Sequence, residues 1–212
     1  MRPNAPGMQV PTLQGHWVAL EPLAEAHREP LRHAANDERI WASTIVRADG
    51  NAFDSWFADA LAEEKSGRRV PFAVRRLADM ACVGSTSYLD IAPKHRRIEI
   101  GATWYRPDAW GTMINPESKL LLLTHAFEVL EVQRVAFITD VENKHSRAAI
   151  LKLGARQEGV LRSHMVSQGG RMRDSVVFSI VASEWPGVRE ALQARTAGRA
   201  EHGARGRRAN RG

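Results

Sequence analysis

The stretch that decides the fold runs from Trp110 to Lys119 and reads WGTMINPESK. Gly111 permits backbone torsions that other residues resist. Asn115 is a good N-cap, Pro116 suits a first helical position, and Glu117 favours the positive end of a helix dipole. We therefore expect a helix start with several N–H groups that lack intrahelical acceptors, which is a place where an anion can bind. Taken alone, the pattern also suits an ordinary strand-to-helix connection.

A second polar helix start lies further along the chain, at Asn143–Ser146, and its helix ends at Gly154. Both Asn and Ser serve routinely as N-cap or first-turn residues, so a purely structural role stays open for Asn143 and Ser146. A residue that caps a helix can also bind a ligand. Two such helix starts, one after each of two successive strands, are parts from which a site for a phosphate-bearing ligand can be built.

The sequence between and around these starts predicts a mixed sheet. Residues 97–104 alternate cleanly, with Ile98, Ile100 and Ala102 expected on one face and Glu99 on the other. The pattern predicts antiparallel strands early, a strand–helix–strand crossover in the middle and a late hairpin, with helices on both faces in an α+β fold. The expected strands are 17–20, 70–75, 82–89, 97–104, 135–138, 160–166 and 175–181, and the expected helices are 23–35, 53–64, 116–130, 143–153 and 183–194.

Composition sets the broad class of protein. The chain has 212 residues, of which 43% are hydrophobic and 25% charged, as in an ordinary globular domain. Cys82 is the only cysteine, which excludes an intrachain disulfide and argues against a cysteine-based metal site. No apolar run approaches the roughly 20 residues that cross a bilayer, and residues 1–11 do not resemble a signal peptide. We expect a cytoplasmic protein with no membrane association and no metal.

The net charge of +6 is concentrated at the C-terminus. Residues 199–212 carry a net charge of +4, so the rest of the chain is nearly balanced. This Gly/Arg/Ala segment has too few apolar residues to fold alone, and we expect a disordered tail. The alternative is weak electrostatic contact with RNA or another polyanion. The expected division is a flexible N-terminus (1–12), one domain (13–186), a possible C-terminal helix (187–198) and the tail.

Several short patterns, in order, resemble the GNAT (Gcn5-related) N-acetyltransferase family. They are Glu99-Ile100-Gly101, Trp110-Gly111 before Glu117–Leu120, Asn143-x-x-Ser146-Arg147-Ala148, Leu151–Ala155, Glu158–Arg162, Asp174-x-x-x-Phe178-Ser179 and Glu184-Trp185. The branch that the chain most resembles contains the ribosomal-protein N-terminal alanine acetyltransferases. Each pattern is weak, but their order and spacing over residues 13–185 are fairly specific.

The resemblance implies a fold in which two central strands, here 97–104 and 135–140, splay apart. It implies acetyl-CoA as co-substrate, with its pantetheine arm in the gap between those strands. Loop and first-turn residues would then hold the pyrophosphate: Gly111, Thr112, Met113, Ile114 and Asn115. Lys119 either adds charge there or lies solvated on the surface. Asn143 matches the family residue that hydrogen-bonds the pantetheine arm, and Ser146 matches a position that faces the sulfur.

Acetyl transfer to an amine also needs a general base, because the amine must be neutral when it attacks. Glu99 is the first candidate, since it lies opposite the Ile98/Ile100 face near the expected splay; its alternative role is an ordinary surface or salt-bridged glutamate. Glu158 and Asp174 are weaker candidates. The expected acceptor is a primary amine, either a protein N-terminus or a small molecule, at a cleft mouth formed by residues 40–54 and the late hairpin.

The pyrophosphate loop departs from the family pattern at two positions. Asp108 stands where Gln or Arg is usual, and adds negative charge near a diphosphate. Met113 stands where a small residue is usual, and adds bulk where the backbone should approach closely. We favour an active enzyme, monomeric or homodimeric, with a variant loop. The alternatives are a GNAT-fold binding module with weakened catalysis and a ribosome- or RNA-associated protein that uses the basic tail.

Overall fold

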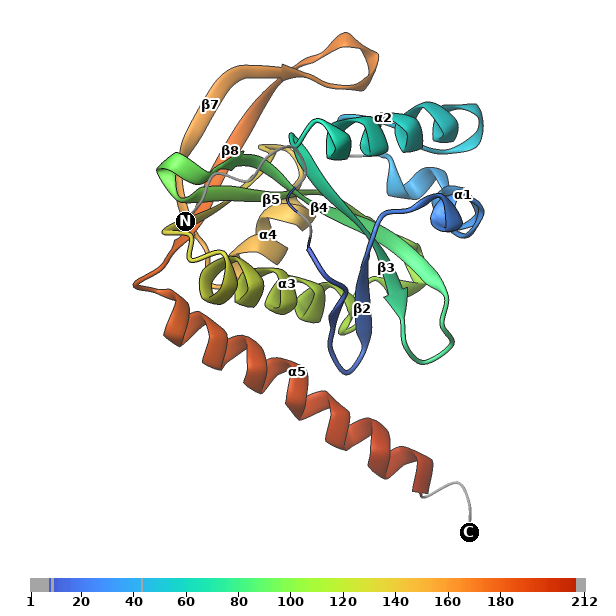
Figure 1. Ribbon diagram of the computed structural model, residues 1–212, viewed down its shortest axis with the longest axis vertical. Coiled ribbons are helices and arrows are strands. Elements are labelled where there is room, and N and C mark those ends of the chain that lie inside the picture. The colour runs from blue at the N-terminus through green and yellow to red at the C-terminus, as the bar shows by residue number, and fades with distance from the viewer. Residues whose placement is uncertain (1–7, 9, 43, 209–212) are drawn as a thin grey trace.

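The computed structural model describes residues 8, 10–42 and 44–208, with side chains up to residue 197. One eight-stranded sheet forms the centre, in the order β1-β2-β3-β4-β5-β6-β8-β7 (Figure 1). All neighbouring strands are antiparallel except β5 and β6. The strands are β1 (Leu13–Gln14), β2 (Val18–Pro22), β3 (Arg69–Arg76), β4 (Cys82–Ala92), β5 (Arg97–Tyr105), β6 (Arg134–Asp140), β7 (Arg156–Val166) and β8 (Met172–Val181).

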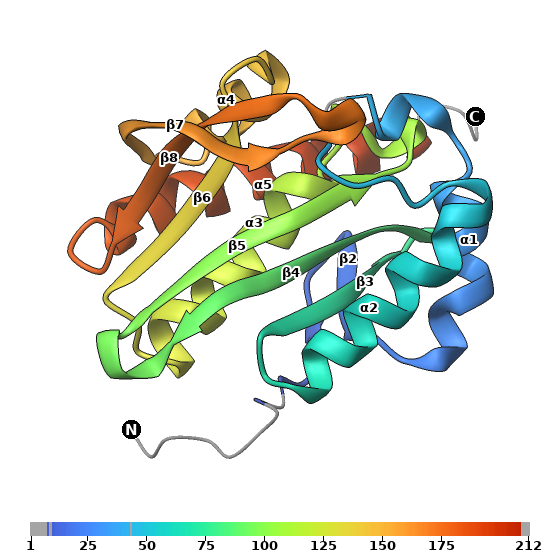
Figure 2. The ribbon, with the colours of Figure 1, turned by 90° about the horizontal axis from the view of Figure 1, so that it is seen from above.

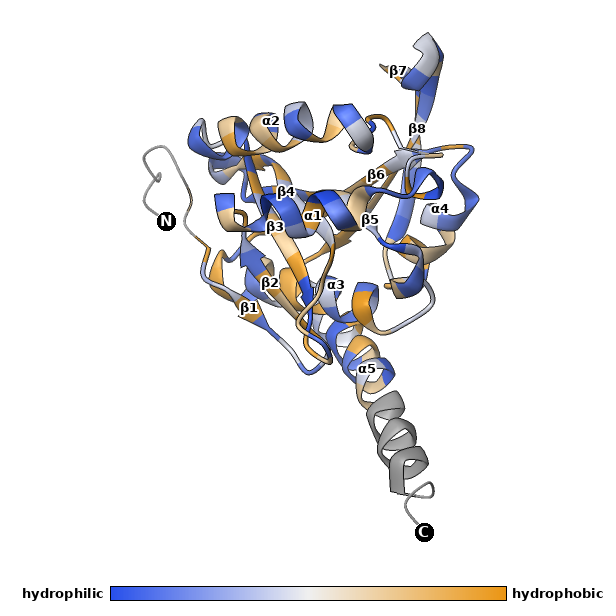
Figure 3. Cartoon of the chain, turned by 90° about the vertical axis from the view of Figure 1, so that its right-hand side faces the viewer, coloured by the Kyte–Doolittle hydropathy of each residue, from blue (hydrophilic) through white to orange (hydrophobic). Residues whose placement is uncertain are grey.

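Helices cover both faces of the sheet, as the sequence predicts (Figures 1 and 2). One hydrophobic cluster joins the sheet to α1 and α2, and a larger one joins its other face to α3, α4 and α5. Hydrophobic residues accordingly concentrate on the strands and on the helix sides that meet them (Figure 3). The helices are α1 (Arg28–Ala35), α2 (Phe53–Lys65), α3 (Ile114–Thr124), α4 (Lys144–Leu151) and α5 (Trp185–Arg208), with short helical turns between several elements.

The parallel pair β5–β6 is short. Its register covers only Arg97–Arg134, Ile98–Val135 and Glu99–Ala136, after which the two strands diverge (Figure 2). The predicted splay of these two strands is therefore confirmed. β6 keeps seven register pairs with β8 on its other side, so the divergence does not unravel the sheet.

A β-bulge in β5 corrects the predicted alternation. Ser85 pairs with Trp104 and Ser87 with Gly101, so two β5 residues stand opposite one β4 residue. Ala102 has φ +45° and is exposed, instead of sharing the buried face of Ile98 and Ile100. The extra residue reverses the alternation for the rest of the strand.

Two helix boundaries also differ from prediction. α3 begins at Ile114 with Met113 as its N-cap, so Asn115 and Pro116 are its second and third residues instead of its cap and first residue. α5 continues to Arg208, through ten residues of the expected disordered tail. Ala, Arg and Glu are good helix formers, so a segment with little apolar surface can still be helical. Residues 209–212 lie outside the described residues.

The expected flexible N-terminus lies only partly within the described residues. Residues 1–7 and 9 are outside them. Val10 is 5% exposed and belongs to the core cluster, with Met8 packed against that cluster. The segment before β1 is thus attached to the core through Met8 and Val10, whereas Pro11 and Thr12 are exposed.

Glu117 fixes the start of α3 against the edge of the sheet. Its carboxylate accepts hydrogen bonds from three consecutive backbone N–H groups, those of His16 (2.8 Å), Trp17 (2.6 Å) and Val18 (2.9 Å). A Cβ on Gly15 would come within 2.4 Å of the Glu117 carboxyl carbon, so a larger residue there would displace the carboxylate from the turn. Glu117 therefore anchors this helix to the β1–β2 turn.

Lys119 is buried between α3 and the sheet. Its side chain donates to Thr86 Oγ1 (3.0 Å) and Thr103 Oγ1 (2.7 Å), directly beside the bulge. Burial lowers the pKa of Lys119 to about 7 from its usual 10.5. The two threonine hydroxyls are 2.8 Å apart and can hydrogen-bond to each other without the lysine.

We predict that Lys119→Met stabilises the fold at pH 7. In the unfolded chain the lysine is protonated up to about pH 10.5, whereas in the fold it is half-deprotonated at about pH 7, so protonation favours the unfolded state between these values. Lys119→Met should raise the free energy of unfolding at pH 7 by about 2–4 kcal/mol, and by little at pH 11. Urea denaturation at both pH values measures this. The exposed Lys65→Met is the control, and a less stable Lys119→Met at pH 7 contradicts the argument.

Candidate active site

The parallel orientation of β5 and β6 brings the two predicted helix starts to the same edge of the sheet. β5 ends at Tyr105 and leads through a short loop to α3, while β6 ends at Asp140 and leads to α4. Since the carboxyl ends of parallel strands lie at one edge, the starts of α3 and α4 both lie where the strands have diverged (Figure 2). Residues 111–115 and Asn143/Ser146 are thus at one edge, as a shared ligand requires.

The start of α4 has the predicted cap. Asn143 Oδ1 accepts a hydrogen bond from the Ser146 backbone N–H (2.9 Å). The cap uses the backbone of Ser146 and not its hydroxyl, and Ser146 is partly exposed. The side chain of Ser146 can therefore act in chemistry without loosening the helix.

Thr112 organises the loop before α3. Its hydroxyl donates to the Ala109 carbonyl (2.6 Å) and accepts from the Ile114 N–H (3.3 Å). Gly111 follows a left-handed backbone path with φ +71°, and a Cβ placed there would have open space around it. A side chain at position 111 would therefore point into open space, and the first-turn N–H groups of α3 follow a few residues later.

The two departures from the family pattern are accommodated. Asp108 is paired with Arg76 (3.0 Å) and Arg106 (2.9 Å). Partial burial acts to raise the pKa of Asp108, but the hydrogen bonds and charges of Arg76 and Arg106 outweigh it and hold the pKa below its usual value. Asp108 therefore does not present an uncompensated negative charge. Met113 is only 9% exposed, so its bulk lies in the core and not on the open side of the loop.

Lys119, which the sequence suggests as an extra charge for the diphosphate or a solvated residue, lies elsewhere. It is 6% exposed, and its ammonium group is hydrogen-bonded under the sheet. Its side chain therefore extends away from the surface that the loop presents. Neither sequence interpretation describes this position.

Glu99 lies at the point where β5 and β6 part, on the face opposite Ile98 and Ile100. Its side chain bends over Gly101, where a Cβ would come within 2.9 Å of Glu99 Oε1. Burial, followed by the negative charge of Asp90, raises the pKa of Glu99 to about 7. A carboxyl with this pKa can take up and release a proton near neutral pH.

The weaker base candidates have structural roles. Glu158 forms an ion pair with Arg134 and accepts a hydrogen bond from Ser179. The Arg134 hydrogen bond lowers the pKa of Glu158 to about 2, so this carboxylate is a poor proton acceptor near neutral pH. Asp174 accepts a hydrogen bond from the Ser163 N–H (2.8 Å) within the hairpin.

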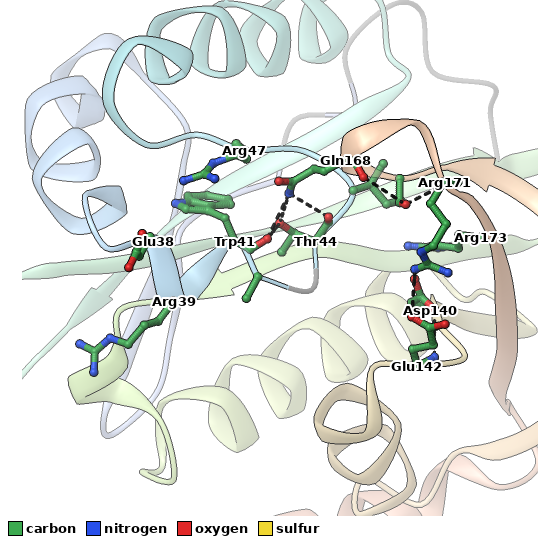
Figure 4. A pocket seen from close by; sticks show the side chains of 13 residues that line it. Glu38, Arg39, Trp41, Thr44, Arg47, Asp140, Glu142, Gln168, Arg171 and Arg173 are labelled. Carbon is green, nitrogen blue, oxygen red and sulfur yellow. Dashed lines mark hydrogen bonds and ion pairs between the residues drawn. The ribbon is translucent and has the colours of Figure 1, made fainter.

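A cavity of about 600 Å³ opens between the segment after α1 and the β7–β8 hairpin (Figure 4). These two segments are more than 120 residues apart in sequence, and Gln168 joins them. Its Nε2 lies within hydrogen-bonding distance of the Trp41 carbonyl (3.1 Å) and the Thr44 carbonyl (2.9 Å). The segments that the sequence predicts for a cleft mouth do enclose a cavity together.

The floor of this cavity is an aromatic cluster. Trp41 lines the cavity and packs against Trp104 of β5, with ring centroids 5.3 Å apart. Trp104 and Tyr105 are both buried, which agrees with the core role that strand-end aromatics usually have. Trp104 thus does not line the cavity itself but packs against Trp41, which does.

The charged lining of the cavity was not singled out from the sequence. Asp140, Arg171 and Arg173 come from the end of β6 and the start of β8. The one available signal is the spacing of Arg171 and Arg173, which places both on one side of a strand. Their approach to Asp140 depends on the β6–β8 pairing, which the local pattern does not disclose.

Two further observations concern membrane crossing and metal binding. Within residues 8, 10–42 and 44–208, no helix combines the length and the apolar character that a membrane crossing requires. In the same part of the chain, no group of three or more His, Cys, Asp or Glu side chains is arranged to hold a metal ion.

Comparison with known proteins agrees with this geometry. The family model described as acetyltransferase (GNAT) domain matches residues 18–156. Among curated proteins, YoaA of Bacillus subtilis (strain 168), by name an uncharacterized N-acetyltransferase, is 33% identical over 122 residues, which are 58% of this chain and 67% of YoaA. YdaF of the same organism, provisionally named a ribosomal N-acetyltransferase, is 33% identical over 111 residues, or 52% of this chain and 60% of YdaF.

A solved structure extends the likeness to most of the chain. The GCN5-related N-acetyltransferase from Brucella melitensis superposes with a TM-score of 0.83 at 31% identity, covering 90% of this chain and 87% of that one. The family match includes the diverging strands β5 and β6 and the starts of the helices that follow them. The chain therefore belongs to the GNAT acetyltransferase family and is an N-acetyltransferase.

Proposed function

We propose that the enzyme transfers an acetyl group from acetyl-CoA directly to a primary amine, either a protein N-terminus or a small molecule. One observation supports this proposal most directly: the starts of α3 and α4 lie at the edge where β5 and β6 have diverged, and Glu99 of β5 lies where the two strands part. GNAT enzymes use acetyl-CoA, and the residues at this edge suit it. The loop leaves space beside Gly111 for a ligand, it leads directly into the first turn of α3, and the charge of Asp108 is compensated.

The residues divide into two groups by role. The first group binds the diphosphate through backbone groups of the loop and the first turn of α3, and consists of Gly111, Thr112, Met113, Ile114 and Asn115. Asn143 orients the pantetheine arm. Lys119 has no part in this contact, because its ammonium group is bonded to Thr86 and Thr103. Bound acetyl-CoA supplies the acetyl thioester.

The second group transfers protons: Glu99 is the general base and Ser146 the general acid. Glu99, acting through water, accepts the proton that the attacking amine loses as its nitrogen bonds to the acetyl carbon. Ser146 donates its hydroxyl proton to the sulfur as the carbon–sulfur bond breaks. The proton gained by Glu99 and the proton lost by Ser146 balance over the reaction.

We predict that kcat/KM rises with pH through about 7 and then levels off, because the ionised form of Glu99 is the base and its pKa is about 7. Asp90→Asn should move this rise to lower pH, since the charge of Asp90 raises that pKa. Glu99→Gln should lower kcat by about 100-fold or more and abolish the rise. An unchanged profile in Glu99→Gln assigns the base to another group.

We predict that Ser146→Ala lowers kcat by about 10–100-fold and leaves acetyl-CoA affinity within about twofold. The helix cap is unaffected because it uses the Ser146 backbone. Steady-state kinetics and calorimetry measure the two effects, and Ser146→Thr, which keeps a hydroxyl, is the matched control. Equal rates in Ser146→Ala and the wild type would remove Ser146 from the mechanism. No binding of acetyl-CoA by the wild type at millimolar concentration would instead favour a binding module without catalysis.

A further inference from the structure

The cavity beside the hairpin is lined by four arginines, and three of them have a carboxylate partner within the protein. These pairs are Arg39 with Asp37, Arg47 with Asp49 and Arg171 with Asp140. Arg171 also approaches Glu142 (3.4 Å). Their charges are therefore largely compensated before any substrate arrives.

Arg173 is the exception. Its Nε donates to Ser175 Oγ (2.9 Å), and Nη2 lies 3.8 Å from Met165 Sδ. Within the described part of the chain, Asp140 and Glu99 act on it only as charges at longer range, and no carboxylate forms an ion pair with it. Arg173 is nevertheless only 5% exposed. A buried guanidinium stays charged and is costly without a hydrogen-bonded anion, so this position calls for a counter-ion.

The position of Arg173 indicates that such a counter-ion would bind in the cavity. Arg173 lines the cavity, alongside Asp140 and Arg171 (Figure 4). It is also close enough to Glu99 for their charges to influence each other. Arg173 thus connects the cavity to the carboxylate that takes the amine proton. A molecule that enters the cavity meets Arg173 of β8 as a cation, and Glu99 lies on β5, beyond β6, within range of the Arg173 charge.

We propose that the acceptor carries an anionic oxygen group, a carboxylate or a phosphate, near its primary amine, and that Arg173 binds this group while the amine faces Glu99. The inference rests on the proposed function, because it names the acceptor class of the same site. A planar guanidinium suits both anions, since it can donate two parallel hydrogen bonds to either. The paired arginines around it steer negatively charged molecules less, because their own carboxylates offset them.

Matched pairs of amines test this proposal. The pairs are O-phosphoethanolamine with ethanolamine, glycine with glycinamide, and the C-terminally amidated dipeptides Ala-Asp with Ala-Asn. Within each pair the anionic group is replaced by a neutral one; because this also changes the pKa of the amine, kcat/KM is compared for the neutral amine. The pairs separate phosphate from carboxylate and small molecules from peptide N-termini. Initial rates are measured with saturating acetyl-CoA at about pH 8.5, where Glu99 is ionised.

The wild type should favour the anionic member of at least one pair by about tenfold or more in kcat/KM, mainly through KM. Arg173→Gln should reduce this preference to about twofold or less, and Arg173→Lys should retain part of it. Arg39→Gln removes the same charge from the same cavity, but from an exposed, paired position, and should keep the preference. Thermal unfolding confirms that each variant is folded.

Equal rates for both members of every pair overturn the proposal, as does a preference that survives in Arg173→Gln. Failure of the proposed function looks different, because then the wild type acetylates no amine. In that case calorimetry with O-phosphoethanolamine and with amidated Ala-Asp, in the presence of CoA, decides the matter. Binding by the wild type that is lost in Arg173→Gln supports the anion site, and no binding of either probe overturns it.

Discussion

The parallel pairing of β5 and β6 stops after three residues, and the rest of the site depends on this interruption. Each strand remains fully supported on its outer side, β5 by β4 and β6 by β8. Beyond Glu99 and Ala136, the facing edges of these strands carry backbone groups that no ladder joins. The sheet thus provides two fixed, diverging edges, and the helix that follows each strand begins beside them. A flexible loop would not hold two helix starts in such a defined relation.

The bulge at Ala102 belongs to the same arrangement. By taking one extra residue into β5, it turns Thr103 toward α3 and Trp104 toward the cavity side. Lys119 meets Thr103 under the sheet, while Trp104 supports Trp41 above it. One additional residue in a strand therefore determines which side chain contacts α3 and which supports the wall of the cavity.

Most of the fold can be predicted from the sequence because most helices and strands have a recognisable local pattern. The Trp56/Phe57/Ala60 face of α2 and the alternation of β5 up to Ile100 are examples. The failures concern residues whose position is set by distant partners. Ala102 continues a locally perfect alternation, and only its register with β4 makes it a bulge. Asn115-Pro116 is a strong capping pattern, but α3 already begins at Ile114, whose N–H donates to the Thr112 hydroxyl. Charged residues at a helix start normally face water; here Glu117 meets the β1–β2 turn and Lys119 meets two threonines.

The same reasoning explains the candidate site. The start of α4 was predictable because its Asn143 cap has a local signature, whereas Arg173 and Gln168 needed the tertiary structure. Gln168 closes the cavity by a few hydrogen bonds from one side-chain amide to a segment that carries no strand or long helix of its own. The two halves of the proposed site are therefore built differently, with the proposed cofactor side set in the sheet and the proposed acceptor side set in surface segments. Substitutions around Gln168 can reshape the proposed acceptor cavity while the folding core stays the same, so this fold can acquire new substrates at little cost in stability.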